Sequence, residues 1–178
     1  MGTGLLLCRE QSRVSALICG GTGSHSLSLA QPEELPDRLE SGTVNVPGIC
    51  GIRAGVEFVR NKGQAGVYAH ELRCLQYLYD RIHHCPALRT YTPRPQAGAT
   101  APVLSVNIQG CTSEETAALL NNEGIAVRAG LHCAPSAHRR FGTLEQGTVR
   151  LAPSAFSTLE EAAYISEVFY KIAQKRLH

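Results

Sequence analysis

The sequence contains no run of apolar residues that approaches the roughly 20 needed to cross a membrane. Its first ten residues, MGTGLLLCRE, lack a basic segment and carry only a short apolar stretch, so they do not resemble a signal peptide. The formal charge of +2 comes from mixed signs without a basic stripe, which argues against nucleic acid and acidic membrane surfaces as partners. We therefore expect a protein that is neither exported nor inserted in a membrane.

Several short signatures of ligand sites are also missing. The run GGTGSHS at 20–26 has neither the GxGxxG of a dinucleotide fold nor the GK[ST] of a phosphate loop, so it is expected to be a flexible polar loop whose amides could hold an anion. His132, Cys133 and His138 are possible zinc ligands, but no CxxC or HxxxH pair accompanies them. The seven cysteines, odd in number and without a framework spacing, favour reduced thiols in a cytoplasm.

What is present predicts a compact domain preceded by other elements. A length of 178 residues, 43% hydrophobic and 18% charged, suits one ordinary globular domain, or a small domain plus part of another. Apolar residues at helical spacing predict helices over 47–61 and 64–84, and two capping boxes, Thr112 with Glu115 and Thr158 with Glu161, begin two more. The predicted strands cover 4–8, 13–17, 88–92, 104–108, 125–128 and 147–152. From about Leu88 onward the order of elements is typical of an α+β domain.

The segment 124–138, GIAVRAGLHCAPSAH, places Cys133 on a short loop after an apolar strand pattern. Positive charge on Arg128, His132 and His138 would favour the thiolate, which is the nucleophilic form. A glycine and a proline bracket the cysteine, so the loop can turn sharply and hold it at a surface. Three interpretations stay open on these residues alone: a reactive thiol, one of several small buried hydrophobic side chains, or a metal ligand.

Two further positions have the chemistry of a binding site. Arg150 lies on the polar face of the predicted strand 147–152, and a guanidinium binds a carboxylate, such as that of an amino acid, through two parallel hydrogen bonds. The alternative is a surface arginine paired with a nearby glutamate. Gly42 and Thr43 offer an unencumbered amide and a hydroxyl that suit a phosphate oxygen, although the same pair could form a plain turn.

Two long motifs now carry a family resemblance. The run RAGLHCAPSAH, followed by GTVRLAPSAFSTLEEA, resembles the C-terminal domain of cysteine desulfurases, which are pyridoxal-phosphate enzymes of the class V aminotransferase group. The upstream run GGTGSHSLSLAQPEELPDRLESGTVNVPGICGIRAGVEFV is similar to the segment that joins the large and small domains of those enzymes. The RxGxHCA loop further resembles the subgroup that includes the selenocysteine lyase-like desulfurases.

The resemblance implies an α/β chain that is the C-terminal portion of a fold type I pyridoxal-phosphate-dependent transferase and ends in a small α+β domain. Residues 1–47 would then be the remnant of the large cofactor domain and its connecting loop. Residues 48–87 would be linking helices, and 88–178 the small domain with the cysteine loop.

The resemblance also implies residue roles. Cys133 matches the cysteine that attacks the sulfur of L-cysteine and carries it as a persulfide, which leaves L-alanine and passes the sulfur to an acceptor protein. Arg150 matches the arginine that binds the substrate carboxylate, and Arg128 the arginine beside the cysteine loop. Gly42 and Thr43 match the pair that reaches across a homodimer to the phosphate of pyridoxal 5'-phosphate in the other subunit.

One part of the family site has no match in this sequence. Members carry a Schiff-base lysine in a motif like HKxxxGPxGxG, with an aspartate and a histidine against the pyridine ring. Lys62, Lys171 and Lys175 are the only lysines, and none lies in such a motif. We therefore expect most of the cofactor site to lie upstream of Met1, and the chain alone to be inactive. The alternatives are a selenocysteine lyase, another class V enzyme, or a non-catalytic small-domain fragment.

Overall fold

The computed structural model describes residues 2–10, 14–25 and 27–176, and the chain divides into two units, Met1–Asn61 and Lys62–His178. Each unit is considered by itself. The second unit contains the helices α2 (Gln64–Ile82), α3 (Ser113–Asn122), α4 (Pro135–Phe141) and α5 (Leu159–Arg176), and the strands β1 (Leu88–Thr90), β2 (Leu104–Ile108) and β3 (Val149–Leu151). In the part of the chain that the structure describes, no helix is both long and apolar enough to span a membrane.

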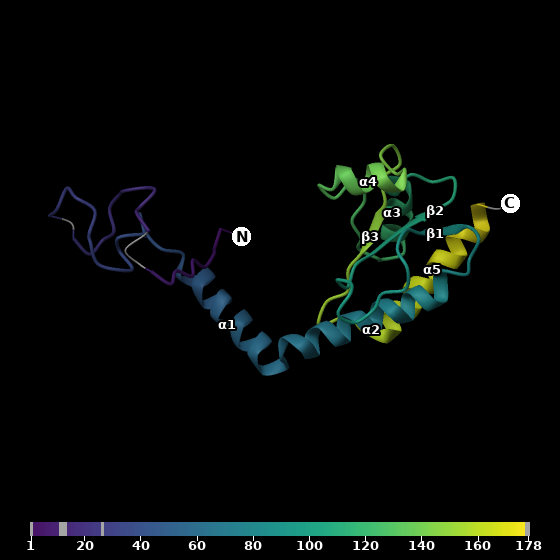
Figure 1. Cartoon of the computed structure of the whole chain (residues 1–178), viewed down its shortest axis with the longest axis horizontal. Helices are drawn as coiled ribbons and strands as arrows, with labels where there is room; N and C mark the ends of the chain where they lie inside the picture. Colours follow the sequence, from purple (N-terminus) through teal and green to yellow (C-terminus); the bar gives the residue numbers. More distant parts are fainter. Residues whose placement is uncertain (1, 11–13, 26, 177–178) are drawn as a thin grey trace. The chain divides into compact units, whose positions relative to one another are not determined.

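The three strands form one antiparallel sheet with β2 in the centre (Figure 1). Val106 of β2 pairs with Thr90 of β1 and Val149 of β3, while Ser105 pairs with Arg150. Because side chains alternate between the faces of a strand, the valines point to one face and Ser105 and Arg150 to the other. The alternation predicted β2 with its correct bounds, and β1 and β3 are shorter than the predicted strands 88–92 and 147–152.

Helices α2 and α5 lie side by side and supply much of the core beneath this sheet (Figure 1). Phe169 of α5 is completely buried, and Leu75 of α2 is 1% exposed. Burial of such side chains stabilises the fold by about 1.5–3 kcal/mol each. Of the α5 residues predicted to face inward, Ala162, Phe169 and Ile172 are buried and Ile165 is partly buried against the core.

Both predicted capping boxes form. The Thr112 N–H donates to the Glu115 carboxylate at 2.9 Å, and the Glu115 N–H donates to the Thr112 hydroxyl at 3.2 Å. Thr158 and Glu161 make the same reciprocal pair at the start of α5, at 2.8 and 3.1 Å. Each box satisfies two amides that a helix start leaves without partners, so each fixes where its helix begins.

The predicted strand 125–128 is wrong except at its last residue. The Ile125 N–H donates to the Leu120 carbonyl at 3.0 Å, and the Gly124 N–H donates to Asn121. With Gly124 at φ 76°, these bonds close the end of α3, so the amide of Ile125 is not available to a sheet. Only Arg128 pairs with β3, in an isolated bridge to Arg150.

Helix α4 was not predicted, because its sequence PSAHRRF has no apolar period. Its ends nevertheless carry local signals. Pro135 occupies the first turn, where its missing N–H costs nothing, and Gly142 follows the helix with the left-handed φ of 67°.

The unit Met1–Asn61 has a different character, since none of its described residues is buried. Its helix α1 (Val46–Lys62) confirms the predicted helix 47–61, and the described residues before it form loops and turns. The predicted strand 4–8 is wrong, and so is the described part, 14–17, of the predicted strand 13–17; residue 13 itself lies outside the described residues. An apolar run makes a strand only when another strand supplies the ladder, and the sheet of this structure lies in the other unit.

Candidate functional site

Cys133 lies on the surface, in the turn that leads from Gly130 into α4, so the predicted exposure is confirmed. His132 and Cys133 have φ values of 51° and 56° and are the two non-glycine residues with positive φ in the described part of the chain. This left-handed region costs an ordinary residue about 1–2 kcal/mol. Two consecutive residues stay there only if the surroundings hold the turn.

The other cysteines give a useful contrast, because all seven are free thiols but they differ in burial. Cys74 of α2 is 2% exposed, and burial raises the pKa of its thiol, with the charge of Arg73 opposing that shift. A thiol that resists ionisation is a poor nucleophile. Cys133 is exposed and belongs to the unit that contains the sheet, and the exposed Cys8, Cys19 and Cys50 belong to the other unit.

Arg128 and Arg150 are brought together by their backbones. The Arg150 N–H donates to the Arg128 carbonyl at 2.7 Å, and the Arg128 N–H donates to the Arg150 carbonyl at 3.4 Å. Residues that exchange both bonds lie opposite one another in an antiparallel pair, with their side chains on the same face. Two like charges placed opposite one another repel, so this arrangement suits an anion between or beside them.

The guanidinium groups of Arg128 and Arg150 form no ion pairs with carboxylates among the described residues. Across the described residues, neither Arg128 nor Arg150 has a salt bridge to a carboxylate, so the alternative of a paired surface arginine finds no support for Arg150. Arg128 is exposed and Arg150 is half-buried. A half-buried guanidinium without a carboxylate partner is a ready site for an incoming carboxylate.

Arg150 lines a cavity of about 150 Å³ on the face of the sheet that carries Ser105. The cavity also contacts both neighbours of Cys133, namely His132 and Ala134. Two hydroxyl oxygens of its lining residues, Tyr91 Oη and Thr148 Oγ1, are buried without a hydrogen-bond partner in the described structure. Buried polar atoms normally have partners, so this cavity has unused capacity for hydrogen bonds next to Arg150.

The two histidines of the cysteine loop already have partners. His132 Nε2 lies 2.9 Å from the Thr148 carbonyl, and His138 Nδ1 lies 2.8 Å from the Thr143 hydroxyl. The stabilisation of the Cys133 thiolate by His132, His138 and Arg128 stays a prediction. Within the described ranges, no group of three His, Cys, Asp or Glu side chains is placed to hold a metal ion.

Gly42 and Thr43 belong to the unit Met1–Asn61, whereas Cys133, Arg128 and Arg150 belong to Lys62–His178. Gly42 has the left-handed φ of 83°, and its N–H donates to the Gly21 carbonyl at 2.9 Å. Thr43 is exposed. Because the Gly42 N–H already has an acceptor, the Thr43 hydroxyl is the group of this pair that is available to a phosphate oxygen.

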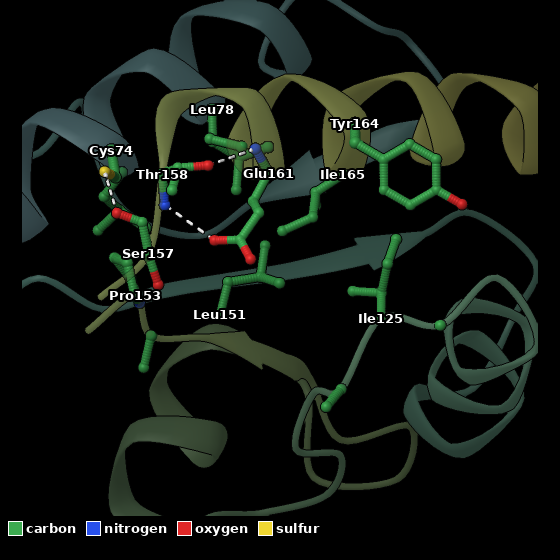
Figure 2. A pocket seen from close by; sticks show the side chains of 15 residues that line it. Cys74, Leu78, Ile125, Leu151, Pro153, Ser157, Thr158, Glu161, Tyr164 and Ile165 are labelled. Carbon is green, nitrogen blue, oxygen red and sulfur yellow. Dashed lines mark hydrogen bonds between the residues drawn. The ribbon is translucent and has the colours of Figure 1, made fainter. Parts of the chain in front are cut away.

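A larger pocket, of about 370 Å³, lies on the opposite side of β3 and does not include the cysteine loop (Figure 2). Leu151 lines it, and Leu151 points away from Arg150 because adjacent residues of a strand face opposite sides. Glu161 projects into it, but its carboxylate accepts the Thr158 N–H as a helix cap (Figure 2). Cys74 Sγ lies 3.8 Å from the Ser157 carbonyl. The carboxylate of Glu161 is therefore already engaged by its own helix, and we do not regard this pocket as the reactive site.

Comparisons with known proteins point to one family. The profile of the Aminotransferase class-V family matches residues 1–165. A probable cysteine desulfurase of Synechocystis sp. is 30% identical over 72% of this chain, and a cysteine desulfurase of Synechococcus elongatus is 35% identical over 77% of it. These matches cover 30% and 21% of the two relatives, so the chain spans less than a third of their length.

Solved structures show the same fold. The cysteine desulfurase from Thermococcus onnurineus NA1 superposes with a TM-score of 0.70 at 28% identity, over 79% of this chain and 34% of that one. The cysteine desulfurase CsdA from Escherichia coli superposes with a TM-score of 0.72 over 88% of this chain and 38% of that one; at 24% identity it bears on the fold alone. The predicted fold, a C-terminal portion of a fold type I transferase, is therefore confirmed. With a family profile matched over 165 of its 178 residues, the chain belongs to the class V aminotransferase family.

Proposed function

We propose that this chain is the sulfur-accepting part of a cysteine desulfurase that converts L-cysteine to L-alanine. The observation that carries the proposal is the exposed Cys133 on a loop anchored to the strand that holds Arg150, with Arg128 paired beside it. A nucleophilic thiol and a carboxylate clamp are the two groups that the reaction requires of the protein at this end of the substrate. The cysteine desulfurase relatives support the same assignment.

In the proposed reaction Arg150 binds the substrate carboxylate through paired hydrogen bonds, and Arg128 adds a second positive charge. The Cys133 thiolate attacks the substrate sulfur, so a sulfur–sulfur bond forms while the carbon–sulfur bond breaks. The electron pair of the broken bond stays on carbon, which takes up a proton to become the methyl group of L-alanine. The balance is L-cysteine plus the Cys133 thiol giving L-alanine plus the Cys133 persulfide, and an acceptor protein then removes the terminal sulfur.

Pyridoxal 5'-phosphate would supply an electron sink for this chemistry. The residues present fit it only in part. The Thr43 hydroxyl is exposed and suits a phosphate oxygen, whereas the Gly42 amide donates to Gly21. Lys62, Lys171 and Lys175 do not lie in a Schiff-base motif, and the Lys171 ammonium is held by Glu123 at 2.7 Å. We therefore propose that the chain alone neither binds the cofactor covalently nor releases sulfide, and that Gly42 and Thr43 serve the partner subunit of a homodimer.

The organisation of the chain belongs to the same proposal. Residues 1–47 would be part of the cofactor domain and its connection, 48–87 linking helices, and 88–178 the small domain. Seven free thiols suit a reducing compartment such as the cytoplasm. Selenocysteine has the same carboxylate and a heavier chalcogen, so the clamp alone does not separate the two substrates.

The test uses the enzyme that contains this chain together with its cofactor-binding region. Replacing Cys133 by alanine should lower sulfide release from L-cysteine by at least about 1,000-fold, because the alanine side chain offers no nucleophile. Mass spectrometry of the protein after one turnover should show one extra sulfur on the peptide that contains Cys133.

The matched control is Cys50→Ala, since Cys50 is also exposed but lies in α1. Cys50→Ala should retain normal sulfide release. Full activity in Cys133→Ala, or extra sulfur on a different cysteine, would refute the proposed role of Cys133.

A further inference from the structure

The ladder between the cysteine loop and β3 has one irregular rung. Arg128 and Arg150 exchange both backbone hydrogen bonds, so the next hydrogen-bonded pair in an antiparallel ladder is Gly130 with Thr148. The Thr148 N–H does donate to the Gly130 carbonyl, at 3.1 Å. The return bond, from the Gly130 N–H to the Thr148 carbonyl, is replaced by two other bonds.

The first replacement involves Ser113 at the start of α3. The Gly130 N–H donates to Ser113 Oγ at 3.1 Å, and Ser113 is completely buried. Gly130 has a φ of 103°, which turns its amide away from β3 and which only glycine adopts readily. Gly147 permits the close approach of the loop, because a side-chain carbon there would lie 2.9 Å from the Gly130 Cα.

The second replacement is the ring of His132. Its Nε2 lies 2.9 Å from the Thr148 carbonyl. A carbonyl only accepts, so Nε2 carries the proton and donates it. The imidazole N–H thus donates to the carbonyl that the Gly130 N–H would otherwise reach. This bond is the last one between the loop and the strand before Cys133.

We propose that His132 is a positioning residue for Cys133. The ring clamps the turn to Thr148, the residue before β3, and so holds His132 and Cys133 in their left-handed conformation. The consequence for catalysis rests on the proposed function, whereas the clamp itself does not. A small displacement of a reacting atom lowers the rate of the chemical step more than it lowers substrate binding.

The test compares two substitutions of similar size. His132→Gln keeps an N–H donor that can reach the Thr148 carbonyl, and His132→Leu does not. Nuclear magnetic resonance of the isotope-labelled chain would measure the exchange rate of the Thr148 amide and the Cα and Cβ shifts of Cys133, which report its φ. His83→Ala is the matched control, because His83 makes a ring-to-carbonyl bond of the same 2.9 Å length to Tyr79 in α2.

We expect Thr148 to exchange at least about 10-fold faster in His132→Leu, with the Cys133 shifts leaving their left-handed values, and both to return toward wild type in His132→Gln. His83→Ala should change neither. In the complete enzyme, His132→Leu should lower kcat at least about 10-fold with KM for L-cysteine unchanged, and His132→Gln should restore it.

Unchanged Thr148 exchange and Cys133 shifts in His132→Leu would overturn the proposal. So would a His132→Leu chain that fails to fold while His132→Gln folds, since the ring would then serve the whole fold. If the spectra change as expected but both His132→Leu and Cys133→Ala keep full activity, the clamp stands and the proposed function fails.

Discussion

The units Lys62–His178 and Met1–Asn61 differ in where their apolar side chains lie. In the first, Leu104 and Phe169 are completely buried. In the second, Leu27 and Leu29 are fully exposed, and helix α1 has no buried residue although its length is close to that of α2. Helices α1 and α2 both have apolar residues at helical spacing, but only α2 buries them.

The difference teaches that an amphipathic pattern determines a helix but not what the helix packs against. Ile49, Val56 and Val59 of α1 are 45–49% exposed, so they form an apolar stripe that the described residues of this unit leave half-exposed. The same holds for the candidate site. The geometry around Cys133 and Arg150 is built by contacts within its own unit, whereas Gly42 and Thr43 lie on an exposed segment.

The largest predicted difference between the two units is in how much a core substitution lowers the free energy of unfolding. Phe169→Ala should lower the free energy of unfolding of the chain by about 3–5 kcal/mol, because it leaves a cavity in the core. Val56→Ala removes a side chain that is 47% exposed and should change the same free energy by less than about 0.5 kcal/mol. Urea denaturation followed by circular dichroism measures both.

Equal losses in the two variants would break the comparison. They would mean that the stripe on α1 is buried in solution, against another surface of the protein. Sedimentation of Val56→Ala and the wild-type chain would then show whether that surface is a second copy.

The sequence predicted the elements whose signals are local. The alternation over 104–108 and the two capping boxes act within a few residues, and β2, α3 and α5 form where they were expected. The predicted strands 4–8 and 125–128 failed because pairing is decided by partners elsewhere: the first has no neighbouring strand, and Ile125 is engaged by Leu120. Helix α4 was missed although Pro135 and Gly142 mark its ends.

The site shows the same division. The sequence singled out Cys133 and Arg150 by residue type and resemblance, and the structure exposes the thiol and leaves the guanidinium without a carboxylate partner among the described residues. The partners of His132 and the unpaired hydroxyl of Thr148 depend on how the loop meets β3. These contacts join residues that are far apart in the sequence, and no periodic pattern of residues predicts them. They were therefore found only in the structure.

The next prediction separates the two halves of the proposed site in the complete enzyme. Arg150→Gln should raise KM for L-cysteine by about 10–100-fold, because one charge-assisted carboxylate contact is worth about 1.5–3 kcal/mol. Thr43→Val, which keeps the shape but removes the hydroxyl, should weaken the binding of pyridoxal 5'-phosphate and leave KM for L-cysteine nearly unchanged at saturating cofactor. Initial rates over a range of both concentrations distinguish the two.

Arg89→Gln is the control for charge alone, since Arg89 is exposed on the same sheet, stacked over Tyr91 at 5.2 Å. It should leave KM within about two-fold of wild type, as expected for a screened surface charge. If Arg89→Gln and Arg150→Gln raise KM equally, the effect comes from the overall positive charge of the surface, and Arg150 does not bind the substrate carboxylate directly.

The smallest predicted effect is the dependence of stability on pH. The Arg94 guanidinium donates two hydrogen bonds of 2.7 Å to Asp80 and thereby lowers the pKa of that carboxyl in the folded chain. The pair therefore stabilises the fold above the unfolded pKa of about 3.9, and this contribution is lost as pH falls through the lower folded pKa. Both side chains are nearly half-exposed, so solvent screens the pair and we expect only a small contribution to stability.

Asp80→Asn should flatten the acid limb of the urea midpoint against pH between about 5 and 2, where the carboxylate otherwise takes up its proton. Glu57→Gln is the matched change in α1, where Arg53 and Glu57 form a more exposed pair at 2.9 Å. Glu57→Gln should leave the dependence of the urea midpoint on pH unaltered. Its ion pair is exposed and lies on a helix without buried side chains, so it adds little to the stability of the core in the other unit. An equal flattening by Glu57→Gln would show that α1 unfolds together with the core, and that the two units are coupled in solution.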